Sequence, residues 1–191
     1  MNLTNDQQNL KSTVERLAHF QSELMRAGNC ENEVALGISR FGIGVIALRK
    51  FSRGEHILNF EGTRLTFDQA VALGDLQCYA MQMTESTYID LGSPGRFVNH
   101  SCSPNAGVSG KRLVAITEIM AGEEIFFDYS TTMDEDFWQM QCRCESADCR
   151  HVIGDFKSLK QDTRDRYIEI GVVPSFAMIA AQRADLRRNV S

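Results

Sequence analysis

The sequence predicts a mostly β domain flanked by helices, which places it in the α+β class. From residue 34 onward, short apolar runs alternate with glycines, a texture typical of many short strands. The residues before Gly28 and after Cys149 instead carry apolar side chains at helical spacing. A chain of 191 residues with 43% hydrophobic residues can bury one core and is too short for two. We therefore expect one domain with helical ends.

Residues 4–27 predict an amphipathic helix. Thr4 and Gln7 have the spacing of a capping box, and Gly28 would end the helix. The apolar face repeats every three or four residues and consists of Leu10, Val14, Leu17, Phe20 and Leu24. This helix packs on the domain or forms the seam of a dimer, so we expect a monomer or a homodimer that associates through the helical flanks.

A short sequence repeat appears within the β region. Residues 47–57 and 115–125 share one pattern, in which a strand leads into a Gly-Glu turn and a second strand follows. Gly54 and Gly122 supply the positive φ that such a turn tends to need. A chance likeness between two unrelated hairpins remains an open alternative.

A short helical pattern lies within residues 64–82, at Thr66, Ala70, Val71 and Leu73, and further helical patterns lie in the tail. The tail predicts a helix from Leu159 to Ile170 that ends at Gly171. Pro174 and Ser175 then open another helical segment, which runs to two arginines at 187 and 188.

The composition excludes several classes of protein. A net charge of -5 argues against a broad basic face for nucleic acid, so we expect no direct nucleic-acid binding. No apolar run approaches the roughly 20 residues that cross a bilayer, and the polar N-terminus does not have the pattern of a signal peptide, so we expect no membrane contact. Six cysteines then favour a reducing compartment, cytoplasm or nucleus, and metal binding over disulfides. Of these, Cys30 and Cys78 stand apart and are expected to be ordinary buried thiols.

The remaining cysteines predict a zinc site. Cys142, Cys144 and Cys149 lie close together in the sequence and can fill three corners of a tetrahedral site. Cys102, which is part of a dense polar motif upstream, is the candidate fourth ligand. Free thiols are the alternative. If zinc binds, it holds the C-terminal segment against the Asn-His segment, with a groove between them.

Two polar or glycine-rich motifs precede the cysteine cluster. Gly42, Ile43 and Gly44 open an apolar strand, and glycines at this spacing let a ligand lie against bare backbone, although an ordinary turn has the same pattern. Asn99 and His100 lie in an apolar strand context, where buried polar side chains must be hydrogen-bonded. A polar turn with a satisfied core histidine is the alternative.

Two aromatic positions are also candidates. Tyr129 ends a strongly apolar strand, where a phenol can orient a reacting group or can pack at a sheet edge. Trp138, next to Phe137 and just before the cysteine cluster, would cover a flat ligand or anchor the segment.

Taken together and in this order, these motifs resemble the SET-domain family of lysine methyltransferases with its post-SET zinc module. The motifs are Gly-x-Gly at 42–44, Arg-Phe-x-Asn-His-Ser-Cys-x-Pro-Asn at 96–105, Gly-Glu-Glu-x-x-Phe-Asp-Tyr at 122–129 and the cysteine cluster. The resemblance implies a knotted, β-clip-like arrangement of small curved sheets. It also implies four regions: an N-terminal flank (1–30), a SET domain (31–131), a post-SET zinc segment (132–152) and a helical tail (153–191).

The resemblance also implies two ligands and their residues. S-adenosyl-L-methionine would occupy one pocket and a lysine-containing protein or peptide a groove on the opposite face, with a narrow channel between them. The expected cofactor-binding residues are Gly42, Ile43, Gly44, Arg96, Asn99, His100, Tyr129 and Trp138. The expected zinc ligands are Cys102, Cys142, Cys144 and Cys149.

Three residues are expected to act at the reacting amine. Tyr129 matches the catalytic tyrosine, and Phe127 matches the position that tunes how many methyl groups are added. Phe60 departs from the family, which usually has a tyrosine there, so one polar wall of the lysine channel is missing. The degree of methylation is therefore open.

We expect a protein-lysine N-methyltransferase, with a histone tail as the substrate by family analogy. The same chemistry on a non-histone protein, a peptide or a small amine is the alternative enzyme. A scaffold that binds a partner through its helical ends, without catalysis, is the non-enzyme alternative.

Overall fold

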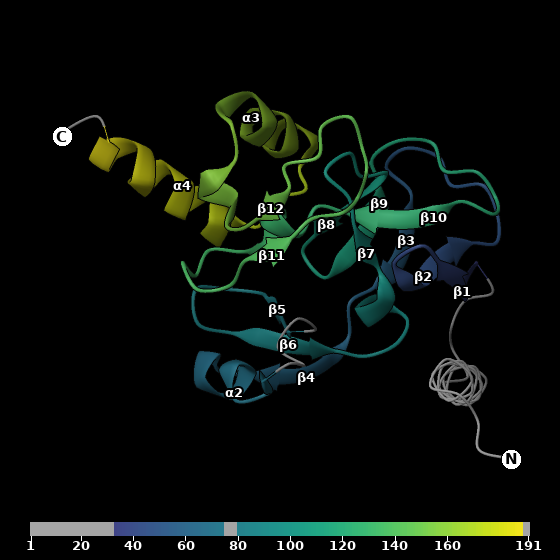
Figure 1. Ribbon diagram of the computed structural model, residues 1–191, viewed down its shortest axis with the longest axis horizontal. Helices are drawn as coiled ribbons and strands as arrows, with labels where there is room; N and C mark the ends of the chain where they lie inside the picture. Colours follow the sequence, from purple (N-terminus) through teal and green to yellow (C-terminus); the bar gives the residue numbers. More distant parts are fainter. Residues whose placement is uncertain (1–32, 75–79, 189–191) are drawn as a thin grey trace, which may run out of the picture.

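The computed structural model describes residues 33–74 and 80–188, and these form four small β-sheets with helices at the C-terminal end (Figure 1). The first sheet has the order β1-β2-β10-β7, with β1 antiparallel to β2 along six residues. Its strands span Val34–Ser39, Gly42–Ala47, Glu124–Phe127 and Asn99–His100. This sheet places the Asn-His motif beside the strand that leads to Tyr129.

The other three sheets are antiparallel. One has the order β3-β9-β8, with strands His56–Asn59, Arg112–Ala115 and Ala106–Ser109. Another has the order β4-β6-β5, with strands Gly62–Leu65, Tyr88–Leu91 and Ala80–Gln82. The last pairs β11 (Met140–Gln141) with β12 (Val152–Ile153). In Figure 1 the β4-β6-β5 sheet lies below β11 and β12. The expected mixed α+β class with many short strands is confirmed.

The two repeated segments, residues 47–57 and 115–125, pair with each other around a local two-fold axis. Phe51 and Ile119 exchange backbone hydrogen bonds of 2.8 and 3.0 Å at its centre. On either side, Ala47 N–H donates to the Glu123 carbonyl just as Ala115 N–H donates to the Glu55 carbonyl, both at 2.9 Å.

Both expected Gly-Glu turns form, with φ of +85° at Gly54 and +89° at Gly122. The strands that flank each turn belong to different sheets, however, so neither segment is a hairpin. The repeat therefore builds the connection between the first two sheets.

The main core lies where these sheets meet. Alternation along β10 buries Ile125 and Phe127 while Glu124 and Phe126 remain partly exposed, as the two-residue period of a strand requires. The largest of the fully buried apolar side chains in this core are Phe51, Phe60, Ile57, Leu113, Ile119 and Ile125.

The short helical pattern expected within residues 64–82 forms one short helix. α2 covers only Phe67–Val71, with the capping box formed by Thr66 and Gln69. The start of the segment lies in β4 and its end in β5, because both pair with β6 and satisfy their backbone groups there. The short helix thus lies between two strands of one sheet.

The helical tail is confirmed. α3 spans Gln161–Ile170 and ends at Gly171, whose φ of +80° is the left-handed conformation typical of a helix end. α4 spans Ser175–Arg188. Val172 packs so closely on β8 that a Cβ at Gly107 would lie 2.6 Å from it. A second apolar cluster therefore fastens the tail to the β body, built from Ile116, Phe156, Leu159, Tyr167, Val172 and Phe176.

Three short 3-10 helices complete the described elements: η2 (Gly95–Phe97), η3 (Tyr129–Thr132) and η4 (Phe156–Ser158). The expected N-terminal helix at 4–27 and the cysteines at 30 and 78 lie outside the described residues. Among helices within the described ranges, none has the length and apolar character to span a bilayer.

Candidate functional site

The site forms where β7 lies parallel to β10. Asn99 pairs with Phe126 and His100 with Phe127, so two motifs far apart in the sequence become neighbours. The strand β10 then leads into η3, which begins at Tyr129. The backbone of the sheet therefore fixes the relative positions of Asn99, His100 and Tyr129.

Asn99 explains the second glycine of the Gly-x-Gly motif. Its Nδ2 donates to the Ile43 carbonyl at 3.0 Å and to Glu124 Oε1 at 2.8 Å. A Cβ at Gly44 would clash with that Glu124 oxygen and lie 3.1 Å from Asn99 Nδ2. Gly42 has a φ of +104°, which a glycine adopts without strain. Gly44 thus lets the Asn99 amide approach the backbone of β2.

His100 is buried and neutral. Its Nδ1 accepts the Tyr129 N–H at 3.2 Å, and its Nε2 lies 3.3 Å from Cys102 Sγ. Burial lowers the pKa of His100 to about 4. A neutral imidazole carries one proton, and because Nδ1 accepts, that proton is on Nε2 and points at the Cys102 sulfur.

Asp128 precedes Tyr129 and is 1% exposed. Arg150 binds both of its carboxylate oxygens, at 2.8 and 2.7 Å, and the Tyr167 hydroxyl donates to Oδ2 at 3.0 Å. Oδ1 also caps η3 by accepting the Ser130 N–H. One buried carboxylate therefore joins the segment of Tyr129 to the cysteine-rich region and to the tail helix α3.

Tyr129 lies between two cavities. Its hydroxyl donates to the Val98 carbonyl at 2.9 Å, and its ring lies 4.8 Å from the Phe127 ring and 5.3 Å from the His100 ring, centroid to centroid. Both cavities described below have Tyr129 in their walls.

The first cavity, here the polar cavity, has a volume of about 420 Å³. Its walls are Asn99, His100 and Tyr129 on one side and residues 140–144 on the other, with Arg40 and Phe41 at the turn between β1 and β2. This volume lies within the range of about 300–1,000 Å³ typical of small-molecule sites. A nucleoside-sized ligand therefore fits the residues present.

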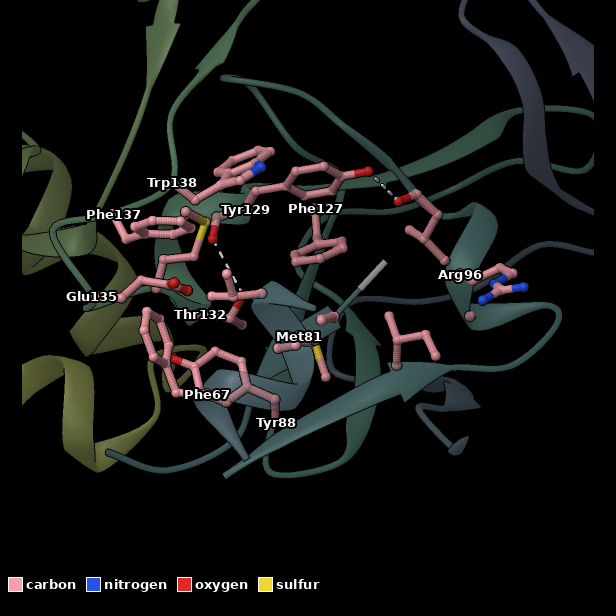
Figure 2. A pocket seen from close by; sticks show the side chains of 17 residues that line it. Phe67, Met81, Tyr88, Arg96, Phe127, Tyr129, Thr132, Glu135, Phe137 and Trp138 are labelled. Atoms are coloured by element: carbon pink, nitrogen blue, oxygen red, sulfur yellow. Dashed lines mark hydrogen bonds between the residues drawn. The ribbon is translucent and has the colours of Figure 1, made fainter. Parts of the chain in front are cut away.

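The second cavity, here the aromatic pocket, is narrow, with a volume of about 60 Å³ (Figure 2). The segment after η3 closes it onto β5, because Asp134 N–H donates to the Gln82 side chain at 2.8 Å. Most of its lining is aromatic or aliphatic, and Glu135 is its one acidic side chain. The rings belong to Phe67, Tyr88, Phe127, Tyr129, Phe137 and Trp138.

Not every residue expected at the site lies at a cavity wall. Phe60 is fully buried behind Phe127, with the ring centroids 5.7 Å apart, and does not line the aromatic pocket. Arg96 and Trp138, expected beside the cofactor, line the aromatic pocket instead of the polar cavity. Gly42, Ile43 and Gly44 lie behind Asn99 rather than in the wall.

Sequence reasoning missed several wall residues. Arg40, Phe41 and Arg143 line the polar cavity, and Phe67 and Glu135 line the aromatic pocket. None of them belongs to a recognisable motif. Only the position of Arg40 and Phe41, directly before Gly42, offered a signal in the sequence.

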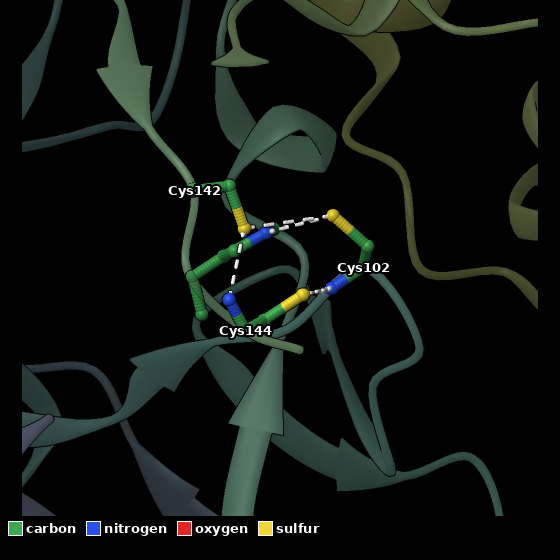
Figure 3. Close-up of side chains that lie close together, drawn as sticks. Cys102, Cys142 and Cys144 are labelled. Atoms are coloured by element: carbon green, nitrogen blue, oxygen red, sulfur yellow. Dashed lines mark hydrogen bonds between the residues drawn. The ribbon is translucent and has the colours of Figure 1, made fainter. Parts of the chain in front are cut away.

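Three of the four expected zinc ligands gather in one buried cluster. Figure 3 shows Cys102, Cys142 and Cys144 together, and one ligand atom from each of them and from His100 lies within 4.8 Å of the others. Cys149 is half-buried at the edge of this cluster, with its sulfur 3.9 Å from the Cys142 carbonyl oxygen.

The cluster has the dimensions of a zinc site. Sulfurs bound at about 2.3 Å to one tetrahedral zinc lie about 3.8 Å apart, and the sulfurs of Cys102 and Cys142 are 3.8 Å apart. Burial raises the pKa of Cys102 to about 11, whereas hydrogen bonds outweigh burial at Cys144 and lower its pKa to about 6. Buried thiolates this close repel one another, so a bound cation suits this donor set.

Comparisons with known proteins identify the same region. Residues 42–130 match the family model of the SET domain. The chain is 35% identical over 143 residues to "Histone-lysine N-methyltransferase ash1" of Drosophila melanogaster, covering 63% of this chain and 6% of that protein. It is 35% identical over 132 residues to "Histone-lysine N-methyltransferase, H3 lysine-36 specific" of Candida albicans, covering 59% and 15% respectively.

A solved structure of a humanized mutant of the Chaetomium thermophilum Polycomb Repressive Complex 2, bound to the inhibitor GSK126, also resembles the chain. The TM-score is 0.47 at 24% identity, and the match covers 53% of this chain and 15% of that one. The chain thus spans a small part of the length of these relatives.

Proposed function

The chain belongs to the SET-domain family, and from that premise we propose that it transfers methyl groups from S-adenosyl-L-methionine to the ε-amine of a lysine in a protein or peptide. One observation carries the proposal. Tyr129 forms part of the wall of the polar cavity and of the aromatic pocket, so a donor on one side and a lysine on the other would meet at its hydroxyl.

On the donor side, the polar cavity would hold the cofactor. S-adenosyl-L-methionine supplies an electrophilic methyl group on a sulfonium sulfur. Asn99 and His100 present side chains and backbone that are fixed by β2 and by the Tyr129 N–H. Arg40 and Phe41 extend this wall, and the segment 140–144 would cover the ligand.

On the lysine side, the chain must bind a neutral amine, since an ammonium has no lone pair. A free lysine has a pKa of about 10.4, so at pH 7 roughly one in 2,500 is neutral. The apolar walls formed by Phe127 and Tyr129 disfavour the ammonium and lower that pKa, as a neighbouring sulfonium charge would. No strong general base is then required.

Alignment is the main contribution of the chain. The Val98 carbonyl already accepts the Tyr129 hydroxyl, so the oxygens of the two residues lie at one point of the wall and could orient the amine hydrogens. Holding an amine in line with a methyl group supplies several kcal/mol, by the entropy argument for pre-oriented reactants.

Phe127 favours repeated methylation. Its ring carries no hydroxyl that would hold a water molecule beside the amine, and the Phe60 ring packs behind it. A lysine that already carries a methyl group therefore finds room to turn and react again. We propose di- or trimethylation as the outcome.

Zinc would hold the segment that follows Tyr129 against the Asn-His strand. We assign Cys102, Cys142, Cys144 and Cys149 as ligands, with His100 outside the set. The proton on His100 Nε2 supports this choice, because a nitrogen that donates to the Cys102 sulfur has no lone pair for a metal. It would act instead as an outer hydrogen-bond donor to a ligating thiolate.

A histone tail is the proposed substrate, because the relatives named above are histone-lysine methyltransferases. A nuclear location would follow from it. We further propose that the SET domain occupies residues 31–131 and the post-SET segment residues 132–152, with flanks at 1–30 and 153–191.

The proposal is tested by incubating the purified protein with cofactor labelled in its methyl group, together with core histones, nucleosomes and a cell lysate. We expect label on lysine in the histone samples. Label in lysate proteins but not in histones would move the activity to a non-histone substrate. Calorimetry that detects neither cofactor nor demethylated-cofactor binding would favour a scaffold.

A further inference from the structure

A carboxylate lies among aromatic rings in the aromatic pocket. Figure 2 shows Glu135 beside the rings of Phe67 and Phe137, in a pocket whose other lining side chains are apolar or aromatic apart from Arg96 and Thr132. Glu135 is half-buried, and its backbone N–H is held by Asp155 Oδ1 at 3.1 Å. The backbone of this segment is therefore fixed, and its side chain extends into the pocket.

The Glu135 carboxylate has no cation of its own within the described residues. Lys157 is the nearby base, and its ammonium lies 2.7 Å from Asp134, 2.7 Å from Asp136 and 3.4 Å from Asp155. No described side chain or backbone group donates a hydrogen bond to the Glu135 carboxylate. Three acidic neighbours thus share one lysine, and the fourth acid faces the pocket alone.

The rings around this carboxylate are exposed. Phe67 and Phe137 are 38% and 52% exposed, with centroids 5.5 Å apart and planes at 82°. The Tyr88 ring lies 5.9 Å from Phe67 on the other side. A cation bound over aromatic faces gains from their negative charge density, and a carboxylate at its edge adds an ion pair.

We propose that Glu135, Phe67 and Phe137 form a subsite for a second basic side chain of the substrate, an arginine or lysine close in sequence to the target lysine. The inference rests on the proposed function, because the same pocket has Tyr129 in its wall, where the target lysine would react. One peptide would then place the target lysine beside Tyr129 and the second cation over the exposed rings of Phe67 and Phe137.

The charge around the subsite supports the proposal. Burial, followed by repulsion from Asp155 and Asp134, raises the pKa of Glu135 to about 7. A bound cation would offset that repulsion and favour the ionised form of the carboxylate. An apolar substrate side chain would leave the Glu135 carboxylate without a partner in a mostly apolar pocket.

Binding of synthetic peptides provides the test. Fluorescent seven-residue peptides with a central lysine carry one arginine at each flanking position in turn, and each is matched to the same peptide with citrulline, a neutral isostere. Anisotropy is measured with the full chain and S-adenosylhomocysteine. We expect arginine at one or two positions to tighten binding about tenfold over citrulline.

Variants link this preference to the subsite. Glu135→Gln is expected to reduce the arginine-to-citrulline ratio to about one, and Phe137→Leu to reduce it by about threefold. Asp136→Asn is the matched control, because its carboxylate is 80% exposed and held by Lys157, and it should keep the wild-type ratio. Thermal unfolding of each variant checks that it folds.

The outcomes separate this inference from the proposed function. Equal binding of arginine and citrulline peptides at every position overturns the subsite, as does a preference that survives in Glu135→Gln. Methyl transfer without the preference leaves the proposed function intact. A preference that depends on Glu135, without transfer of label to any peptide, leaves the subsite and removes the function.

Discussion

The hydroxyl of Tyr167 in the tail helix α3 donates a hydrogen bond of 3.0 Å to Oδ2 of Asp128, the residue before Tyr129. The acceptor is completely buried and also binds Arg150, whose backbone N–H donates to Cys102 Sγ at 3.4 Å. The tail, the cysteine cluster and the segment of Tyr129 therefore meet at one carboxylate.

Tyr167→Phe should destabilise the protein and slow the reaction. The change leaves one side of a buried carboxylate without its donor, which costs about 1.5–3 kcal/mol of unfolding free energy. Because Asp128 also caps η3, we expect kcat to fall more than KM rises. Denaturant unfolding and steady-state kinetics measure the two effects.

A substitution on the exposed face of the same helix is the control for Tyr167. Ile168→Ala should change the unfolding free energy by less than about 0.5 kcal/mol. A Tyr167→Phe protein with wild-type stability and kcat would show that the hydrogen bond has no positioning role.

Tyr129→Phe should lose most methyl transfer while it keeps the fold. The variant retains the ring that packs on Phe127 and His100 but loses the hydroxyl that reaches the Val98 carbonyl. We expect kcat to fall at least about a hundredfold, the scale of removing one positioned polar group. Radiolabelled methyl transfer measures the loss, and full activity would overturn the assigned role.

His100→Ala should impair cofactor binding, which precedes methyl transfer. It removes the acceptor for the Tyr129 N–H and part of the wall of the polar cavity, so cofactor affinity should fall along with turnover. Calorimetry with S-adenosylhomocysteine separates this defect from that of Tyr129→Phe, which should still bind the cofactor.

Local elements were predictable from the sequence, whereas their partners were not. The end of α3 at Gly171 and the turns at Gly54 and Gly122 follow from conformations that glycine alone adopts easily. The pairing of Phe51 with Ile119 does not, because periodicity says that a segment is extended but not which segment it pairs with. That Asn99 and Tyr129 lie close together was predicted only through the resemblance to the SET-domain family, which rests on the order of the motifs.

No sequence motif indicated that Glu135 lines a pocket. Its role in the proposed subsite depends on Phe67, which is far away in the sequence, and on Lys157, which is bound to three other acids. In the sequence it is one acid in the run Asp-Glu-Asp, which is typical of a solvated loop. Only the fold distinguishes the acid that faces a pocket from the two that bind a lysine.

Zinc removal should loosen one segment and leave the β body folded. Metal binding contributes folding free energy to the region that supplies the ligands, while the main core lies in other sheets. A chelator should therefore raise hydrogen exchange at residues 132–152 and abolish methyl transfer. Exchange that rises equally in the core strands would contradict this prediction.

The fourth zinc ligand can be tested separately. Cys149→Ser should lower the zinc content of protein purified without chelators, whereas His100→Gln, which keeps an N–H donor, should retain about one zinc per chain. Elemental analysis measures both. Retention by Cys149→Ser together with loss in His100→Gln would make His100 the ligand.

The stability contributed by Glu135 should depend on pH. Its pKa is raised from 4.5 to about 7 in the folded protein, so between these values the folded state holds a proton that the unfolded chain has lost. Stability from this group is present below about pH 4.5 and is lost as the pH rises through 7. Asp155 and Asp134, which face it, cause part of this shift.

Glu135→Gln isolates this contribution, because glutamine is neutral at every pH. Relative to wild type, the variant should gain in melting temperature as the pH rises from 5 to 8. Thermal unfolding at several pH values measures the difference. A difference that does not change with pH would show that Glu135 titrates normally in the folded protein.

Phe127→Tyr should shift the product toward monomethyllysine. Phe127 lines the aromatic pocket with its ring 4.8 Å from that of Tyr129, so a new hydroxyl there would enter the space beside the reacting amine. It would hold a water or the amine itself and crowd a second methyl group. Mass spectrometry of product at excess enzyme should show di- or trimethyllysine for wild type and mainly monomethyllysine for the variant.

Because Phe60 lies behind Phe127 and not in the pocket wall, Phe60→Tyr should change this pattern less. Monomethyl product alone from the wild-type protein, unchanged by more enzyme, would refute the proposed degree of methylation.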